Sequence, residues 1–237
     1  MSERQYPLQL PPLRRLGRED FMPGEANRTA LAFVEAWPEW SAPSLILVGP
    51  AGSGKSHLAS IWQARAQALL LDAAAFAGRP PRELLGEARA VAIEDLDRAL
   101  AAEPGLAPAF YAVFTAMAER RGWLLLTGRQ PPARWPVALK DLRSRLLAAP
   151  TVAIGRPDDQ LLHAVLVKLL ADRQLEADPK VLAFLMARAE RSLAGLVRLV
   201  ERLDARALEG RSGRRRVTVP LARRCLELLD SERPEAG

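Results

Sequence analysis

Eight consecutive residues carry the clearest chemical signal in the sequence. They follow the pattern GxxxxGK[ST] and comprise Gly49, Pro50, Ala51, Gly52, Ser53, Gly54, Lys55 and Ser56. Glycines allow successive backbone N–H groups to point inward at phosphate oxygens, and a helix that begins at Lys55 adds the positive end of its dipole. Lys55 would then reach the β- and γ-phosphates, while the Ser56 hydroxyl would bind Mg²⁺. The motif predicts a site for ADP or ATP with Mg²⁺; the alternative is a glycine-rich turn that matches by accident.

Two acidic residues supply the second half of this chemistry. Glu94 and Asp95 directly follow the apolar run 91–93. One carboxylate at the end of a buried strand, Glu94, would hold Mg²⁺, and Asp95 would orient or deprotonate the attacking water. The alternative is an acidic cluster that caps the next helix.

The segments around both motifs alternate between strands and helices. Short, continuous apolar runs predict strands at 44–48, 68–71, 91–93, 123–127 and 151–154. Helical spacing predicts helices at 28–36, 55–65, 82–87, 107–121 and 139–147. Unbroken apolar strands are typical of a parallel sheet that is covered on both faces. An α/β fold with helices on both faces of a five-stranded parallel sheet is therefore expected.

The pattern changes at Gly155-Arg156-Pro157, after which every segment has helical period. Asp178-Pro179 is typical of a helix start, with an N-cap followed by proline in the first turn. The residues before 20 are rich in proline and read as extended. Three parts are expected: an extended arm (1–20), an α/β nucleotide-binding domain (21–156) and a small helical domain (157–237).

Composition excludes several classes of protein. The sequence has 237 residues and a net charge of +6, and its basic excess lies in residues 187–224, with eleven arginines and four acidic residues. That excess suits an acidic partner or nucleic acid, or a set of solvated helix faces. One cysteine, Cys225, excludes an intramolecular disulfide framework, and no apolar stretch approaches the roughly 18 residues of a membrane span. A cytoplasmic protein with no membrane partner is expected.

With these motifs in place, the sequence resembles a known family. The run GPAGSGKSHLA, in which His57-Leu58-Ala59 follows the phosphate motif, is similar to the AAA+ ATPase of DnaA-type replication initiators. Asp20-Phe21-Met22-Pro23-Gly24, with Asn27 and Ala30, resembles the family's segment beside the adenine. The resemblance implies an AAA+ P-loop NTPase in which the sensor strand lies between the P-loop strand and the acid-bearing strand. It also implies an all-helical C-terminal lid.

Further site residues follow from this resemblance. Thr127-Gly128 falls at the sensor 1 position, and Arg191 matches sensor 2, so that His57, Thr127 and Arg191 would join the nucleotide site. Leu142-Arg143-Ser144-Arg145-Leu146 resembles box VII, which makes Arg145 an arginine finger that acts in trans on a neighbouring subunit. From the residues alone, Arg145 and Arg191 read equally as ordinary exposed arginines.

The N-terminal arm holds a second short motif. It comprises Gln5, Tyr6, Pro7, Leu8, Gln9 and Leu10 and is similar to the QL[SP]LxL peptide with which Hda-type proteins dock on the β sliding clamp (DnaN). Such a peptide combines polar contacts with leucines that fill an apolar pocket; the alternative is that Leu8 and Leu10 pack on the core. The sequence also ends at Gly237 without the helix-turn-helix reader of DnaA. The combination resembles the Hda-type regulatory inactivators of DnaA.

Two departures from the family pattern bear on catalysis. Glu94 stands where the family's first acid is usually Asp, and Gly128 leaves its sensor position without a side chain. The resemblance, with these departures, implies weak intrinsic ATPase activity and a protein that acts mainly by promoting hydrolysis in DnaA, as an inhibitor of replication initiation. DNA would be reached through the clamp, and contact between AAA+ modules implies a homodimer or a higher oligomer.

Two other functions stay open at this level. A helicase loader that acts on single-stranded DNA would use the basic residues Arg211, Arg214, Arg215 and Arg216, although no aromatic stacking set accompanies them. A P-loop kinase for a small molecule would use the helical lid, but the clamp-like arm would then have no purpose.

Overall fold

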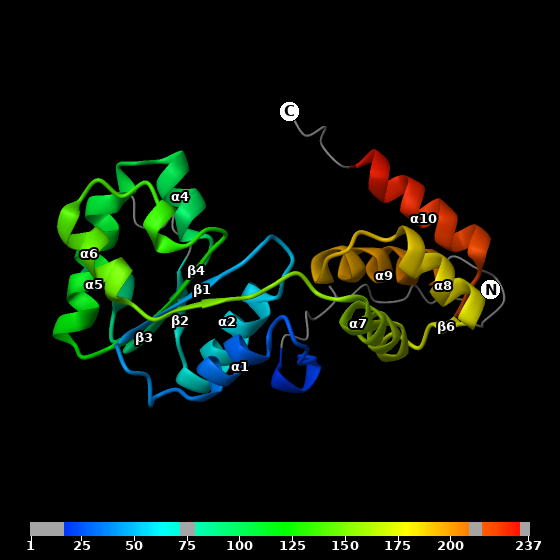
Figure 1. The fold of residues 1–237 in the computed structure, drawn as a ribbon, viewed down its shortest axis with the longest axis horizontal. Coiled ribbons are helices and arrows are strands. Elements are labelled where there is room, and N and C mark those ends of the chain that lie inside the picture. Colours follow the sequence, from blue (N-terminus) through cyan, green and yellow to red (C-terminus); the bar gives the residue numbers. More distant parts are fainter. Residues whose placement is uncertain (1–16, 72–78, 209–214, 233–237) are drawn as a thin grey trace, which may run out of the picture.

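The computed structural model describes residues 17–71, 79–208 and 215–232 (Figure 1). The arm predicted for residues 1–20 is described only from residue 17, where a short 3₁₀ helix spans Arg18–Asp20. The proposed clamp motif at residues 5–10 lies outside the described residues, as do Arg211 and Arg214.

Five parallel strands form the sheet, as the sequence predicted. They are β1 (Ser44–Val48), β2 (Leu69–Leu71), β3 (Ala90–Ile93), β4 (Trp123–Gly128) and β5 (Thr151–Ala153), in the order β2-β3-β4-β1-β5. Every residue of β1 and β3 is buried, which is why these strands are unbroken apolar runs. The order confirms that β4 lies between the P-loop strand β1 and the acid-bearing strand β3.

Helices cover both faces of this sheet (Figure 1). Leu45 and Leu47 of β1 face one hydrophobic core, shared with α1 (Arg28–Glu35) and α2 (Lys55–Ala66). Ile46 and Val48 face the other. The helices of that second core are α3 (Pro81–Leu85), α4 (Leu96–Ala102), α5 (Leu106–Glu119) and α6 (Lys140–Ala148). Side chains of one strand alternate between faces, so a strand covered on both sides supplies two cores.

Two local features go beyond what the sequence predicted. Helix α4 was not predicted, because it is only seven residues long and is separated from α5 by Glu103-Pro104-Gly105. Asn27 occupies the N-cap position of α1, but its side chain makes no capping hydrogen bond. Instead it accepts from the Gly24 N–H at 2.7 Å and donates to the Met22 carbonyl at 3.1 Å. Asn27 therefore braces the turn before α1.

Beyond β5 the chain forms a third hydrophobic core, which belongs to a second domain. Its helices are α7 (Asp159–Asp172), α8 (Pro179–Arg188), α9 (Leu193–Leu208) and α10 (Val219–Ser231), on the right in Figure 1. Asp158 and Asp178 cap α7 and α8 with hydrogen bonds of 2.7 and 2.9 Å. The predicted domain boundary at residue 156 lies between β5 and α7.

This second domain is not entirely helical, which corrects one detail of the expectation. Glu176–Ala177 (β6) and Arg216–Val217 (β7) pair as a short parallel ladder that joins the loop before α8 to the loop before α10. Among the described residues, none of the helices combines the length and the hydropathy that crossing a bilayer requires.

Candidate functional site

The predicted phosphate loop joins the end of β1 to the start of α2. Gly52 and Gly54 have φ values of +71° and +104°, a region that favours glycine. A Cβ atom on Gly49 would lie 2.5 Å from the Ile154 carbonyl oxygen. Ser53 is 2% exposed, and its hydroxyl has no hydrogen-bond partner among the described residues. The loop thus has the backbone shape and a free buried hydroxyl that suit a bound anion.

Lys55 lies inside this loop. It is 7% exposed, and its Nζ donates to the carbonyls of Gly49 at 2.8 Å and Pro50 at 2.9 Å. Burial lowers the pKa of Lys55, and the carboxylate of Asp95 is the main influence that raises it again. Anionic phosphate beside this ammonium group would offset its burial, because an opposite charge favours the charged form.

Ser56 and Glu94 are brought together across the sheet. The Ser56 hydroxyl donates to Glu94 Oε2 at 2.9 Å, which joins the start of α2 to the end of β3. A hydroxyl and a carboxylate at this spacing are hard oxygen ligands that fit Mg²⁺, which normally keeps several waters and takes phosphate oxygens as well. These two residues would hold the ion, which would neutralise developing charge on the phosphates.

Asp95 and Thr127 are linked at the carboxyl edge of the sheet. The Asp95 N–H donates to Thr127 Oγ1 at 2.9 Å, and Asp95 adopts φ +46° at the start of α4. Thr127 is 1% exposed. Its hydroxyl oxygen therefore positions the acidic loop, and its sensor 1 role toward a nucleotide stays a prediction.

Asp97 is a residue of this site that sequence reasoning missed. It is 7% exposed, and its Oδ2 accepts from the backbone N–H groups of Arg129 at 2.7 Å and Gln130 at 3.1 Å. Asp97 therefore ties the start of α4 to the loop that leaves β4. The acidic cluster at 94–97 was the available signal, but nothing local pairs Asp97 with residues more than 30 positions away.

The structure gives a packing reason for Gly128. A Cβ atom there would lie 2.8 Å from Cζ2 of Trp135 and 3.2 Å from Cγ of Asp97. Trp135 is itself fixed, since its Nε1 donates to the Gln130 carbonyl at 2.6 Å. The missing side chain at this sensor position is therefore a consequence of close packing at the end of β4.

The lid contacts the phosphate loop next to Arg191. The Leu193 N–H donates to the Gly52 carbonyl at 3.0 Å, and a Cβ on Gly52 would lie 2.9 Å from Cβ of Ser192. Arg191 itself is exposed and forms an ion pair with Asp159 of α7. The predicted sensor 2 residue is thus adjacent to the site, with its guanidinium group held by the lid.

Arg145 lies on α6 and contacts none of the residues of the phosphate loop or of the acidic segment 94–97 in the described structure. It is exposed on α6, and its guanidinium carbon lies 5.9 Å from the Tyr111 ring centroid and 5.8 Å from that of Phe114. No ion pair joins Arg145 to an acidic residue in the described ranges. Cation–π contacts at exposed sites stabilise by about 0.5–1 kcal/mol each, enough to orient a guanidinium group.

His57 fastens the leading segment, residues 17–27, to the phosphate-loop helix. Its Nε2 lies 2.9 Å from the Gly17 carbonyl oxygen, and its ring meets the edge of Phe21 at a centroid distance of 5.1 Å. Asp20 in the same segment pairs with Lys168 of α7 at 2.8 Å. The leading segment therefore contacts both domains. His57 packs against this segment, and its predicted contact with a nucleotide stays a prediction.

The environment of His57 predicts a dependence of stability on pH. Burial lowers the pKa of His57 in the folded chain. The neutral ring therefore stabilises the fold above the ordinary histidine pKa of about 6.5, and this contribution is lost as the pH falls below it. We expect the melting temperature to fall between about pH 6.5 and pH 5, and to fall less in His57→Gln.

His163, the other histidine of the chain, supplies the control. It is exposed on α7, so His163→Gln should retain the wild-type pH profile. Melting curves from His57→Gln with the same pH profile as wild type would contradict the assignment.

In the described part of the basic C-terminal region, two arginines form ion pairs with acidic residues of the lid. Arg215 pairs with Asp204 and donates to the Arg173 carbonyl at 2.9 Å. Arg216 lies 3.7 Å from Asp178. These pairs weaken the alternative that this region reads single-stranded nucleic acid, for which free cations would be needed.

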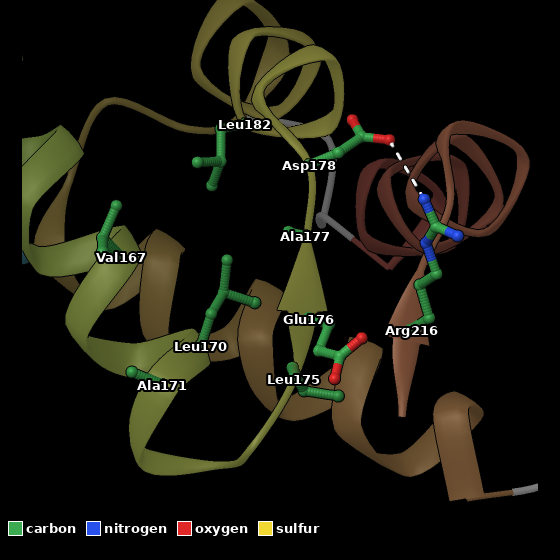
Figure 2. Close-up of a pocket in the computed structure, with 9 residues that line it drawn as sticks. All are labelled: Val167, Leu170, Ala171, Leu175, Glu176, Ala177, Asp178, Leu182 and Arg216. Atoms are coloured by element: carbon green, nitrogen blue, oxygen red, sulfur yellow. Dashed lines mark ion pairs between the residues drawn. The ribbon is translucent and has the colours of Figure 1, made fainter. Parts of the chain in front are cut away.

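A separate pocket of about 440 Å³ opens in the lid (Figure 2). Apolar side chains of α7 and α8 border it, and the Asp178–Arg216 ion pair closes one side. None of the residues predicted for the phosphate site lines it, so it is not the nucleotide site.

This parallel sheet with a P-loop after β1, acids after β3 and a helical lid defines the chain as an AAA+ protein. Residues 158–226 match the family model described as "Hda, lid domain". The second domain is therefore similar to the lid of Hda-type proteins, and the fold of the chain as a whole is that of the DnaA structures reported next.

Solved structures with the same fold include several initiators. Domain III of DnaA from Thermotoga maritima has a TM-score of 0.77 and 17% identity, over 90% of this chain and 95% of that chain. DnaA from Aquifex aeolicus bound to AMPPCP has a TM-score of 0.66 and 20% identity, over 82% and 67%. DnaA bound to AMPPCP and single-stranded DNA has a TM-score of 0.65 and 19% identity, over 77% and 62%. No curated protein sequence is significantly similar to the chain.

Proposed function

We propose that this chain is a nucleotide-bound regulator that stimulates ATP hydrolysis by DnaA and so limits replication initiation. It binds ADP or ATP with Mg²⁺ at the phosphate loop, docks on the β sliding clamp through residues 5–10, and donates Arg145 to the ATP of a DnaA subunit. DNA is reached through the clamp.

The exposed, oriented Arg145 is the observation that carries this proposal. A finger that acts in trans must project from the surface and must not be neutralised by its own chain. Arg145 is exposed, rests against two aromatic rings and has no ion pair with the described acidic residues. Guanidinium groups stabilise the charge that develops during phosphoryl transfer.

Support for nucleotide binding comes from the loop and from a structural relative. The Lys55 ammonium, the glycines with positive φ and the Ser56–Glu94 pair suit a Mg²⁺–nucleotide complex. The A. aeolicus DnaA of the same fold was solved with AMPPCP, an ATP analogue. Glu94 and the absent side chain at Gly128 favour slow hydrolysis by this chain itself. Bound nucleotide would then act mainly by setting the shape of the surface through which the chain meets other proteins.

The clamp contact rests on the sequence of the arm. Gln5 would make polar contacts, and Leu8 and Leu10 would fill an apolar pocket. Prolines in the arm reduce the conformational entropy lost on binding.

The decisive experiment measures hydrolysis of ATP bound to purified DnaA. Adding the full chain with clamp-loaded DNA should accelerate hydrolysis, and leaving out the clamp should remove most of the effect. A variant with Gln5, Leu8 and Leu10 replaced by alanine should lose clamp binding in a pull-down and behave as if the clamp were absent. Unchanged DnaA hydrolysis with every component present would refute the function; retained clamp binding by the variant would refute the arm assignment.

A further inference from the structure

The apolar pocket of the lid has no part in the function proposed above. Its volume of about 440 Å³ lies within the roughly 300–1,000 Å³ of ligand pockets. In Figure 2 the side chains of Val167 and Leu170 on α7 extend toward Leu182 on α8. Val167 is 41% exposed, so the pocket is open to solvent. An open pocket with apolar walls favours an occupant that inserts aliphatic side chains, because both surfaces then leave water.

The rim of this pocket carries an acidic group that could recognise a cation. Glu176, Asp178 and Arg216 all line the pocket. Asp178 lies 3.7 Å from Arg216, whereas no basic residue in the described ranges forms an ion pair with the exposed Glu176. The carboxylate of Glu176 would therefore complement a basic group beside the apolar part of the occupant.

The first described residues lie close to the pocket. Asp20, three residues after the start of the described chain, pairs with Lys168 of α7 at 2.8 Å. Ala171, which lines the pocket, follows Lys168 by three positions, and such side chains are neighbours on a helix, with about 5–6 Å between their Cβ atoms. Residues 1–16, which lie outside the described residues, are therefore joined to the chain beside the pocket.

The sequence just before the described chain has the chemistry that this pocket requires. In the run 10–16, LPPLRRL, a leucine recurs at every third position, and two prolines and two arginines stand between the leucines. Prolines favour the polyproline II conformation, whose three residues per turn would place the leucines on one edge and the arginines on the others. Seven residues in this conformation extend about 20 Å, so even the far end of the run can reach the pocket.

We propose that the run 10–16 docks in the lid pocket of its own chain, with its leucines in the apolar part and an arginine facing Glu176. Because the tether is short, the effective concentration of the run at the pocket is high, and a contact of modest area is enough to hold it. Leu10 also belongs to the proposed clamp motif, so the pocket and the clamp compete for this arm. That competition rests on the proposed function and deepens it, since the arm is then released mainly where a clamp takes it.

The first test traps the contact in the full chain. Leu13→Cys combined with Ala171→Cys places one cysteine in the run and one in the wall of the pocket, and cysteine is itself a small apolar side chain. The native Cys225 is buried and should not react. Mild oxidation should give an intramolecular disulfide, detected by mass spectrometry of a digest made without reducing agent.

Leu13→Cys combined with Ala183→Cys is the matched control. Ala183 is an exposed alanine of α8 that does not line the pocket. The pocket pair should form its disulfide about tenfold faster than the control pair, because the rate follows the effective concentration of the two thiols. Equal rates, or a disulfide that joins two chains, would overturn the contact.

The second test measures the affinity of the full chain for the clamp. Val167→Asp introduces a charge into the pocket at an exposed position, so that the arm should be released while the lid stays folded. The affinity should rise about threefold or more, because an arm that is docked for most of the time is unavailable to the clamp. Ala183→Asp introduces the same charge outside the pocket and should keep the wild-type affinity.

The two tests separate this inference from the proposed function. An unchanged clamp affinity in Val167→Asp would overturn the competition between the pocket and the clamp. A wild-type chain that bound no clamp would overturn the proposed clamp contact, and the disulfide rates would still decide whether the run 10–16 docks in the lid.

Discussion

Arg145→Ala is expected to remove the stimulation of DnaA, with a loss of about 10³-fold or more in the stimulated rate, the range for arginine fingers supplied in trans. Arg145 is exposed and pairs with no described acidic residue, so its removal should leave the fold intact. Clamp binding should also persist, because the proposed clamp motif lies in the arm. The measurement is single-turnover hydrolysis of DnaA-bound ATP with clamp-loaded DNA.

Two further variants sharpen the Arg145 experiment. Arg145→Lys should also fail, since an ammonium group lacks the planar, bidentate geometry of guanidinium. Arg143→Ala removes the same charge from α6 two positions away, on a different side of the helix, where the guanidinium donates weakly to the Ala133 carbonyl at 3.4 Å. It should retain stimulation. If Arg145→Ala still stimulated the hydrolysis of DnaA-bound ATP at the wild-type rate, Arg145 would not be the arginine finger.

Lys55→Met should abolish measurable nucleotide binding, with a loss of about 100-fold in affinity, the upper range for hydrogen bonds to a charged group. Methionine preserves the buried, apolar stem of the side chain but removes the ammonium that meets Gly49 and Pro50. At a ligand concentration about 100 times the dissociation constant, binding stabilises a protein by about 2.7 kcal/mol. For a chain of this size the wild type should gain about 5–10 °C in melting temperature, and the variant almost nothing.

Lys180→Ala controls for the loss of a lysine elsewhere. Lys180 is exposed on α8 and belongs to no part of the site, so the nucleotide-dependent gain should match the wild type. The melting temperature of unliganded Lys55→Met reports separately whether the fold survives. A folded Lys55→Met variant with the full nucleotide-dependent gain would contradict the role of Lys55.

The sequence predicted the elements of the nucleotide-binding domain closely. Strand 44–48 matches β1 at both ends, and the strand order implied by the family resemblance is confirmed. These predictions succeeded because their signals are local: a buried parallel strand needs an unbroken apolar run, and the loop needs glycine where φ is positive. Helix α4 was not predicted, because seven residues are only about two helical turns and show too little hydrophobic periodicity to identify a helix.

Local signals also located the phosphate loop and the acids of the candidate site. The pattern around Lys55 and the pair Glu94-Asp95 could be read directly, and the fold brings Ser56 to 2.9 Å from Glu94. The N-cap residue Asp178 of α8 was also predicted from the sequence, and its capping hydrogen bond is confirmed.

Only the tertiary structure decided how distant residues are used. It placed the buried Asp97 on the backbone of Arg129, packed Gly128 against Trp135 and paired Arg191 with Asp159. The first and third of these pairs are 32 positions apart, and the second is seven positions apart. No residue in a local window determines whether they meet, because their approach depends on strand register and on how helices pack on the sheet. The sequence by itself therefore identified the groups that are predicted to bind phosphate, and the fold decided which cations and carboxylates surround them.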